Sequence, residues 1–219
     1  MALIDTPTER TTAATDAILA LLALGCGLYL LWFGQSDPWK AGLWAGIFGL
    51  LALSAVLGAV AHGFKMSAKT NARLWQPLNL TLGLIVGLFV VAIIYDLWGL
   101  PAVRWTLPLM IGVGIAFFAV TQMIPDTFLV FVVYQIGAML FALVAYGWLA
   151  INQQLAGAGL MAAGILVTMM AAGVQAGQSV SFTFIWKFDH NGAYHLIQMA
   201  GIILLTAGLR ATFLAANQF

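Results

Sequence analysis

The chain has 219 residues, of which 63% are hydrophobic and 7% are charged, with a net charge of +1. A typical soluble domain carries roughly 25% charged residues, so this composition excludes a water-soluble globular protein. The near-zero net charge provides no basic surface, which excludes nucleic acid as an expected partner.

The apolar runs predict an all-α, polytopic membrane protein that forms one seven-helix bundle over residues 1–219. A helix needs about 20 apolar residues to cross the hydrocarbon core, and these runs are too long for barrel strands. The expected spans are 16–33, 39–62, 74–97, 103–124, 127–151, 155–175 and 189–213. Thr15 or Asp16 is expected to cap the first span, and 176–187 to form a looser connection.

Seven spans place the two chain ends on opposite sides of the membrane. The side of the N-terminus carries the most basic connection, with Lys65, Lys69 and Arg73 between the second and third spans. Cytoplasmic segments are enriched in Lys and Arg, so we expect a bacterial inner-membrane protein whose N-terminus is cytoplasmic. Membrane lipids are the expected partners, and both a homo-oligomer and a partner in a membrane complex stay open.

Several other features have structural interpretations. Glycines in the second and third spans are expected to allow close helix packing, namely Gly42, Gly46, Gly49, Gly83 and Gly87. Asp96 is expected to pair with Arg104, and Ser54 to bond back to its own helix.

Polar residues gather at the start of the seventh span. Asn191, His195 and Gln198 are spaced i, i+4 and i+7, so they share one helix face, which Tyr194 borders. Polar groups that face lipid cost a few kcal/mol each, so this face is expected to point into the bundle.

Three histidines are expected at similar depth on one side of the membrane. His62 ends the second span, whereas His190 and His195 open the seventh. One interpretation is a zinc ion held by these three imidazoles, since three nitrogen ligands and a water form an open hydrolytic site. The alternative is that these groups bond to one another and to interfacial water without a metal.

The neighbouring polar groups have expected roles under the first interpretation. Asn79 and Asp189 are the candidate catalytic residues, because Asp189 could accept a proton if it faces the site. Asp189 is alternatively the N-cap of the seventh helix. The remaining polar residues would orient a water or a substrate carbonyl, namely Gln175, Asn191, Tyr194 and Gln198.

At these residues the chain resembles the superfamily of alkaline ceramidases, adiponectin- and progestin-type receptors and bacterial hemolysin III proteins. The resemblance implies a seven-helix bundle with zinc held by one histidine of the second helix and two of the seventh, together with an aspartate and a serine. His62 and His195 match the histidine positions. In this chain Asn191 stands where the other histidine is expected, Gly58 replaces the serine, and Asn79 replaces the aspartate.

The seventh span is also similar to uncharacterised bacterial membrane proteins with an H-N-x-x-Y-H-x-x-Q pattern. The matching residues are His190, Asn191, Tyr194, His195 and Gln198. Together these features predict a membrane protein with a cytoplasmic-side polar pocket, interpreted first as a zinc-dependent hydrolase of a lipid amide or ester.

A non-enzymatic lipid- or ligand-binding protein, or an accessory subunit of a membrane complex, is the alternative. A proton-linked transporter is less favoured, because no charged residue is expected at mid-membrane.

Overall fold

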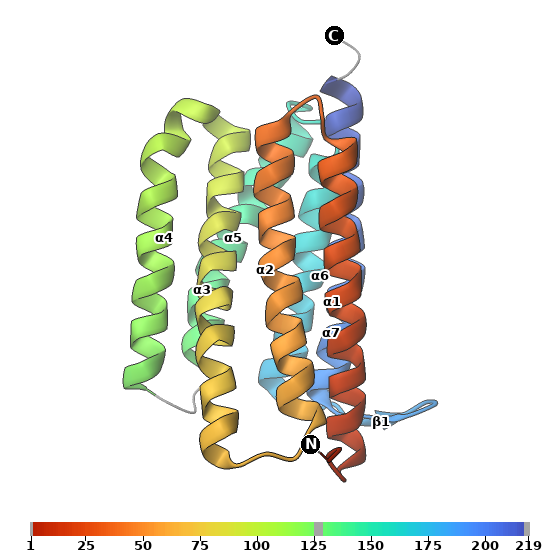
Figure 1. The fold of residues 1–219 in the computed structure, drawn as a ribbon. Coiled ribbons are helices and arrows are strands. Elements are labelled where there is room, and N and C mark those ends of the chain that lie inside the picture. Colours follow the sequence, from red (N-terminus) through yellow and green to blue (C-terminus); the bar gives the residue numbers. More distant parts are fainter. Residues whose placement is uncertain (1, 125–128, 217–219) are drawn as a thin grey trace.

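The computed structural model describes residues 2–124 and 129–216. The helices are α1 (Pro7–Phe33), α2 (Pro38–Gly63), α3 (Ala68–Trp98), α4 (Leu100–Met123), α5 (Leu129–Ile151), α6 (Ala158–Gly177) and α7 (His190–Ala216), with two short strands, β1 (Phe182–Thr183) and β2 (Lys187–Phe188), between the last two helices (Figure 1). Seven helices within the described ranges are long and apolar enough to cross a membrane, which confirms the predicted fold class.

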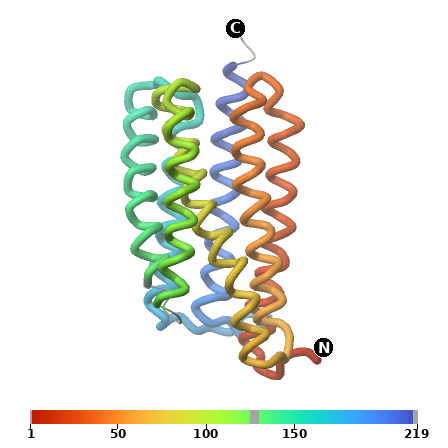
Figure 2. The backbone as a smooth tube through the Cα atoms, turned by 60° about the vertical axis from the view of Figure 1, so that its left-hand side comes forward, coloured from red at the N-terminus to blue at the C-terminus, as the bar shows by residue number. Residues whose placement is uncertain are grey.

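The helices run along a common axis and pack mainly with their neighbours in the chain (Figure 2). There are two exceptions: α1 packs against α7 as well as α2, and α3 packs against α5. The first contact brings the first and last helices side by side. The start of α1, the end of α2 and the start of α7 lie at the same end of the bundle (Figure 1). This end is where the sequence placed the three histidines.

The first helix begins at Pro7, nine residues before the predicted start. The polar segment ahead of the apolar run is helical, since Pro stands at the first helical position and Glu9 lies in the first turn, where both residues are favourable. Thr15 and Asp16 are therefore not caps. Both are buried in the body of α1, with exposed fractions of 1% and 5%.

The third helix also begins earlier than predicted. Ser67 accepts a hydrogen bond from the backbone N–H of Thr70 at 3.1 Å and caps α3, so that Lys69 and Arg73 lie on a helix rather than in a loop. The sixth helix starts at Ala158, three residues late, after Gly157 turns the chain with a φ of +81°. A right-handed helix cannot include a residue in this left-handed conformation, so α6 begins only after Gly157.

The connection from α6 to α7 is a small antiparallel hairpin. Phe182 pairs with Phe188 and Thr183 with Lys187. The rings of Phe182 and Phe188 stack with centroids 4.9 Å apart. The predicted looser segment thus contains a defined turn that leads directly into the polar start of α7.

Asp96 pairs with Lys40 rather than with Arg104. The Lys40 Nζ lies 2.6 Å from Asp96 Oδ1, and both side chains are at most 3% exposed. Tyr146 of α5 donates to the other carboxylate oxygen at 2.8 Å. A buried charge needs a close partner, and α2 supplies a lysine there.

The glycines divide into two groups. A Cβ on Gly83 would lie 2.6 Å from Gly114 O, and one on Gly87 would lie 2.6 Å from Met110 O, so both allow the close packing that was predicted. Gly42, Gly46 and Gly49 have no such neighbour within 4 Å, so the prediction is wrong for them.

Candidate functional site

A cavity of about 310 Å³, here named the histidine cavity, lies at the end of the bundle that holds the start of α1. All three histidines line it, as their predicted depth indicated. Its polar lining comes from four helices and the segment after α6, and consists of Asp16, Ser54, His62, Gln175, Gln178, His190, Asn191, Tyr194 and His195. Leu51, Leu82 and Phe131 belong to its apolar lining.

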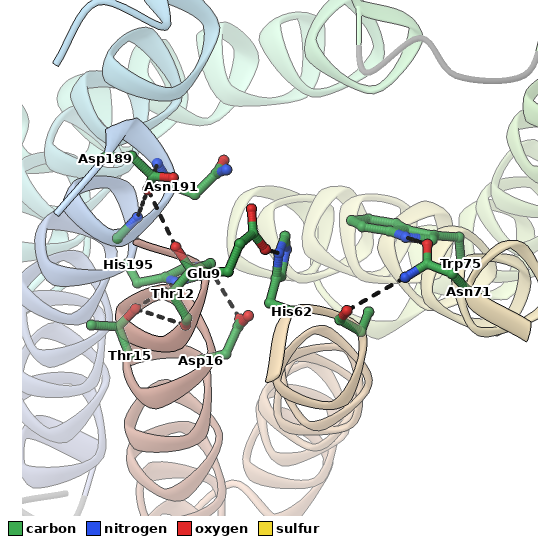
Figure 3. A network of polar contacts seen from close by, with 12 residues as sticks. Glu9, Thr12, Thr15, Asp16, His62, Asn71, Trp75, Asp189, Asn191 and His195 are labelled. Carbon is green, nitrogen blue, oxygen red and sulfur yellow. Dashed lines mark hydrogen bonds and ion pairs between the residues drawn. The ribbon is translucent and has the colours of Figure 1, made fainter. Parts of the chain in front are cut away.

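His195 is held on both sides by α1 (Figure 3). Its Nδ1 lies 2.9 Å from Thr15 Oγ1, and its Nε2 lies 3.1 Å from Asp16 Oδ1. The side chains of His195 and Asp16 are 8% and 7% exposed. The sequence analysis missed this contact, although an acidic residue inside an apolar run is itself a signal for a functional or paired group.

Thr15 and Asp16 of α1 contact the two ring nitrogens of His195. The Thr15 hydroxyl lies 2.9 Å from both Thr12 O and His195 Nδ1, and the tautomer of His195 sets which atom donates in the second contact. The Nε2 of His195 and the carboxyl of Asp16 are close enough for a hydrogen bond between them.

His62 is held by a different carboxylate of the same helix. Its Nδ1 lies 2.7 Å from Glu9 Oε2, and its ring packs edge-on against Trp75 with centroids 5.9 Å apart (Figure 3). Trp75 Nε1 in turn donates to Asn71 at 2.9 Å. The helical segment that extends α1 to Pro7 is what places Glu9 within reach of His62.

Asp189 is the N-cap of α7. Its Oδ1 accepts from the backbone N–H groups of Asn191 and Gly192, both at 3.0 Å, and from Thr12 Oγ1 at 3.2 Å. The capping role predicted for Asp189 is confirmed, whereas its catalytic role stays a prediction. Since Thr12 belongs to α1, the cap also joins the start of α7 to α1.

The other predicted site residues are placed as follows. Gln175 donates to Asn191 Oδ1 at 3.3 Å, which links α6 to α7 in the histidine cavity. Ser54 bonds back to Leu51 O at 2.9 Å, as predicted. Asn79 is half-buried on α3 and is not among the residues that line the cavity.

A second cavity, here named the inner cavity, adjoins the first and has a volume of about 70 Å³. Four residues line both cavities, namely Leu51, Leu82, Phe131 and Tyr194. The rest of its lining is mostly aliphatic and aromatic, and Gln198 faces it instead of the histidine cavity. The inward face of α7 is therefore shared between the two cavities.

The side chains around the histidine cavity do not fit a zinc centre as they lie. In the part of the chain that the structure describes, no group of three or more His, Cys, Asp or Glu side chains could hold a metal ion. Both nitrogens of His195 already have partners, and so does Nδ1 of His62. Zinc thus stays a prediction.

The fold and this cavity define a polytopic membrane protein with seven candidate spans and a polar cavity between its helices. The chain belongs to the Family of unknown function (DUF6962), whose model matches residues 11–212. No curated protein and no solved structure matches the chain. The resemblance to the ceramidase and adiponectin-receptor superfamily stays a prediction.

Proposed function

We propose that this protein binds a neutral, single-chain amphiphile within the membrane, with the polar end in the histidine cavity and the chain in the inner cavity. The observation that carries the proposal is that the polar cavity and the apolar cavity adjoin, sharing Leu51, Leu82, Phe131 and Tyr194. Binding sites for small molecules are usually concave and mostly apolar, with a few polar groups that set orientation.

A neutral polar end suits the histidine cavity because its charged groups are already balanced. Asp16 is paired with His195, and Glu9 is paired with His62. The imidazole of His190 makes no hydrogen bond to any residue within 2–124 and 129–216, so it is available to a ligand. Tyr194 and Gln178, which also line the cavity, add neutral polar groups.

A photoreactive probe tests this function. The probe is decan-1-ol with a mid-chain diazirine, added to the purified protein and activated by light. We expect saturable labelling of peptides that contain Leu51, Leu82 or Phe131, which excess decan-1-ol prevents. Labelling that excess decan-1-ol leaves unchanged would contradict the proposal.

A matched pair of substitutions separates the cavity from the lipid-facing surface. Ala55 is 4% exposed and lines the histidine cavity, so Ala55→Phe should fill it and remove the saturable labelling. Ala116 is exposed on α4, so Ala116→Phe should leave the labelling unchanged. If Ala55→Phe does not fold, the competition with decan-1-ol in the unmodified protein decides alone.

A zinc-dependent hydrolase is a second candidate function. It is supported by the fact that His62, His190 and His195 all line one cavity. It predicts bound zinc in the purified protein, and a sharp loss of zinc in the double variant His62→Ala, His195→Ala. Elemental analysis measures both. Absence of zinc from the unmodified protein would exclude this candidate without affecting amphiphile binding.

A further inference from the structure

The hairpin between α6 and α7 ends in an exposed apolar turn, here named the hairpin tip, which consists of Phe184, Ile185 and Trp186. These side chains are 81%, 76% and 54% exposed. The backbone N–H of Phe184 donates to Trp186 O at 3.2 Å and closes the turn. Turns that face water are usually built from Gly, Asn, Asp, Ser and Pro, and none of these residue types occurs in the tip. An apolar surrounding therefore suits the tip better than water.

The base of the hairpin is packed against the bundle. Phe188 of β2 is 6% exposed, and its ring lies 3.0 Å from the position of a Cβ on Gly192. The strand β2 contacts both α1 and α7. The stacked rings of Phe182 and Phe188 continue this packing along the hairpin. The packed base thus holds the tip outside the bundle, where the hairpin projects sideways (Figure 1).

The depth of the hairpin follows from its contact with α1. This helix has 27 residues and is about 40 Å long, which is close to the thickness of a bilayer with its headgroup layers. Asp189, directly after β2, accepts from Thr12 at 3.2 Å. Thr12 lies about 8 Å along the helix from Pro7. Since the hydrocarbon occupies only about the central 30 Å of a bilayer, the hairpin lies close to the boundary between hydrocarbon and headgroups.

We propose that the hairpin tip is a membrane anchor that inserts into the interfacial layer of the leaflet beside α1, with lipid as its partner. Aromatic side chains concentrate in this layer, and the indole of Trp186 offers an apolar ring together with an N–H donor for the headgroups. Lys187, which follows the tip and is exposed, can extend its ammonium group toward lipid phosphates.

The anchor goes beyond the proposed function and also bears on the histidine cavity. Gln178 and His190 stand at the two ends of the segment that contains the hairpin, and both line that cavity. Insertion of the tip therefore keeps the histidine cavity at the depth of the lipid headgroups.

A spin label on the tip tests the anchor in the full-length protein. Ile185→Cys in the Cys26→Ala background carries a nitroxide, and the protein is placed in vesicles of phosphatidylcholine and phosphatidylglycerol. Collisions of the label are measured with oxygen, which concentrates in hydrocarbon, and with Ni(II)-EDDA, which stays in water. We expect an oxygen-to-nickel collision ratio several-fold above that of Ser67→Cys, an exposed position at the start of α3. Leu21→Cys, 73% exposed in the middle of α1, is the control for a label in hydrocarbon.

Phe184→Cys repeats the measurement at a second exposed position, so that the test does not depend on one variant. A collision ratio at both tip positions as low as that of Ser67→Cys would overturn the anchor and leave the tip in water. Low collision rates with both reagents would also overturn it, because a second copy of the chain would then cover the tip. No alcohol is present in this measurement, so failure of the anchor leaves amphiphile binding to the labelling experiment.

Discussion

Asp16 lies in an apolar helix, and its position depends on one glycine of the neighbouring helix. A Cβ placed on Gly58 of α2 would lie 2.8 Å from Asp16 Oδ2 and 3.1 Å from its Cγ. Only glycine therefore leaves room for the carboxyl group where it meets His195. Gly58, which stands where the predicted resemblance expects a serine, thus has its own structural role here.

Gly58→Ala should destabilise the protein and weaken the site. Inserting a methyl group into a well-packed interior costs about 1–3 kcal/mol, and here it must move the Asp16 carboxyl away from His195. Thermal unfolding of the purified variant should show a lower Tm. Saturable labelling by the diazirine probe should also fall, because the wall of the histidine cavity changes.

Gly49→Ala on the same helix is the control for this substitution. No atom lies within 4 Å of a Cβ at Gly49, so the added methyl group meets open space. The alanine should leave stability unchanged or raise it by up to about 1 kcal/mol through its better helix propensity. Equal Tm values for the two variants would show that Gly58 does not position Asp16.

The contact between α6 and α7 affects both cavities, because residues of both helices line each cavity. Glycines make this contact close. A Cβ on Gly164 would lie 3.0 Å from Gly201 O, and one on Gly208 would lie 2.9 Å from Gly157 O. Small residues let helix backbones approach in a membrane, where packing rather than the hydrophobic effect drives association.

Gly164→Ala should therefore separate α6 from α7 and lower the Tm by an amount that corresponds to about 1–3 kcal/mol. Gly173 lies on the same helix, and a Cβ added there has no atom within 4 Å, so Gly173→Ala should not destabilise the protein. Thermal unfolding of the two variants in one detergent measures the difference. A Tm for Gly164→Ala that equals that of Gly173→Ala would contradict the importance of this contact.

The helical face of α7 could be predicted from the sequence, whereas the residues opposite it could not. The i, i+4, i+7 spacing of Asn191, His195 and Gln198 depends only on helix geometry, and the structure turns His195 and Gln198 inward. The partner of His195 depends on where α1 begins and how it is rotated. The first residues of α1 are polar, so the sequence predicted neither the true start of the helix nor the direction that Asp16 faces. Asp16 was therefore predicted to be a cap.

At the scale of the whole molecule, hydropathy alone determined the number of spans, because the length of an apolar run is a local property. It also placed the three histidines at one end of the bundle. Lateral neighbours were less predictable. Asn79 was expected in the site, but it does not line the histidine cavity. Arg104 was expected beside Asp96, but Lys40 of α2 takes that place.

The basic residues at the end of α2 and the start of α3 predict the orientation of the molecule in the membrane. Lys65, Lys69 and Arg73 lie at the end of the bundle that holds the histidine cavity, and positively charged segments stay in the cytoplasm. Cys26→Ala gives a cysteine-free background for labelling with a membrane-impermeant maleimide. Ser36→Cys should react from outside a bacterial host cell, and Ser67→Cys only in inverted vesicles, since both positions are exposed at opposite ends. The reverse pattern would place the histidine cavity on the outer side, and the amphiphile would then be drawn from the outer leaflet.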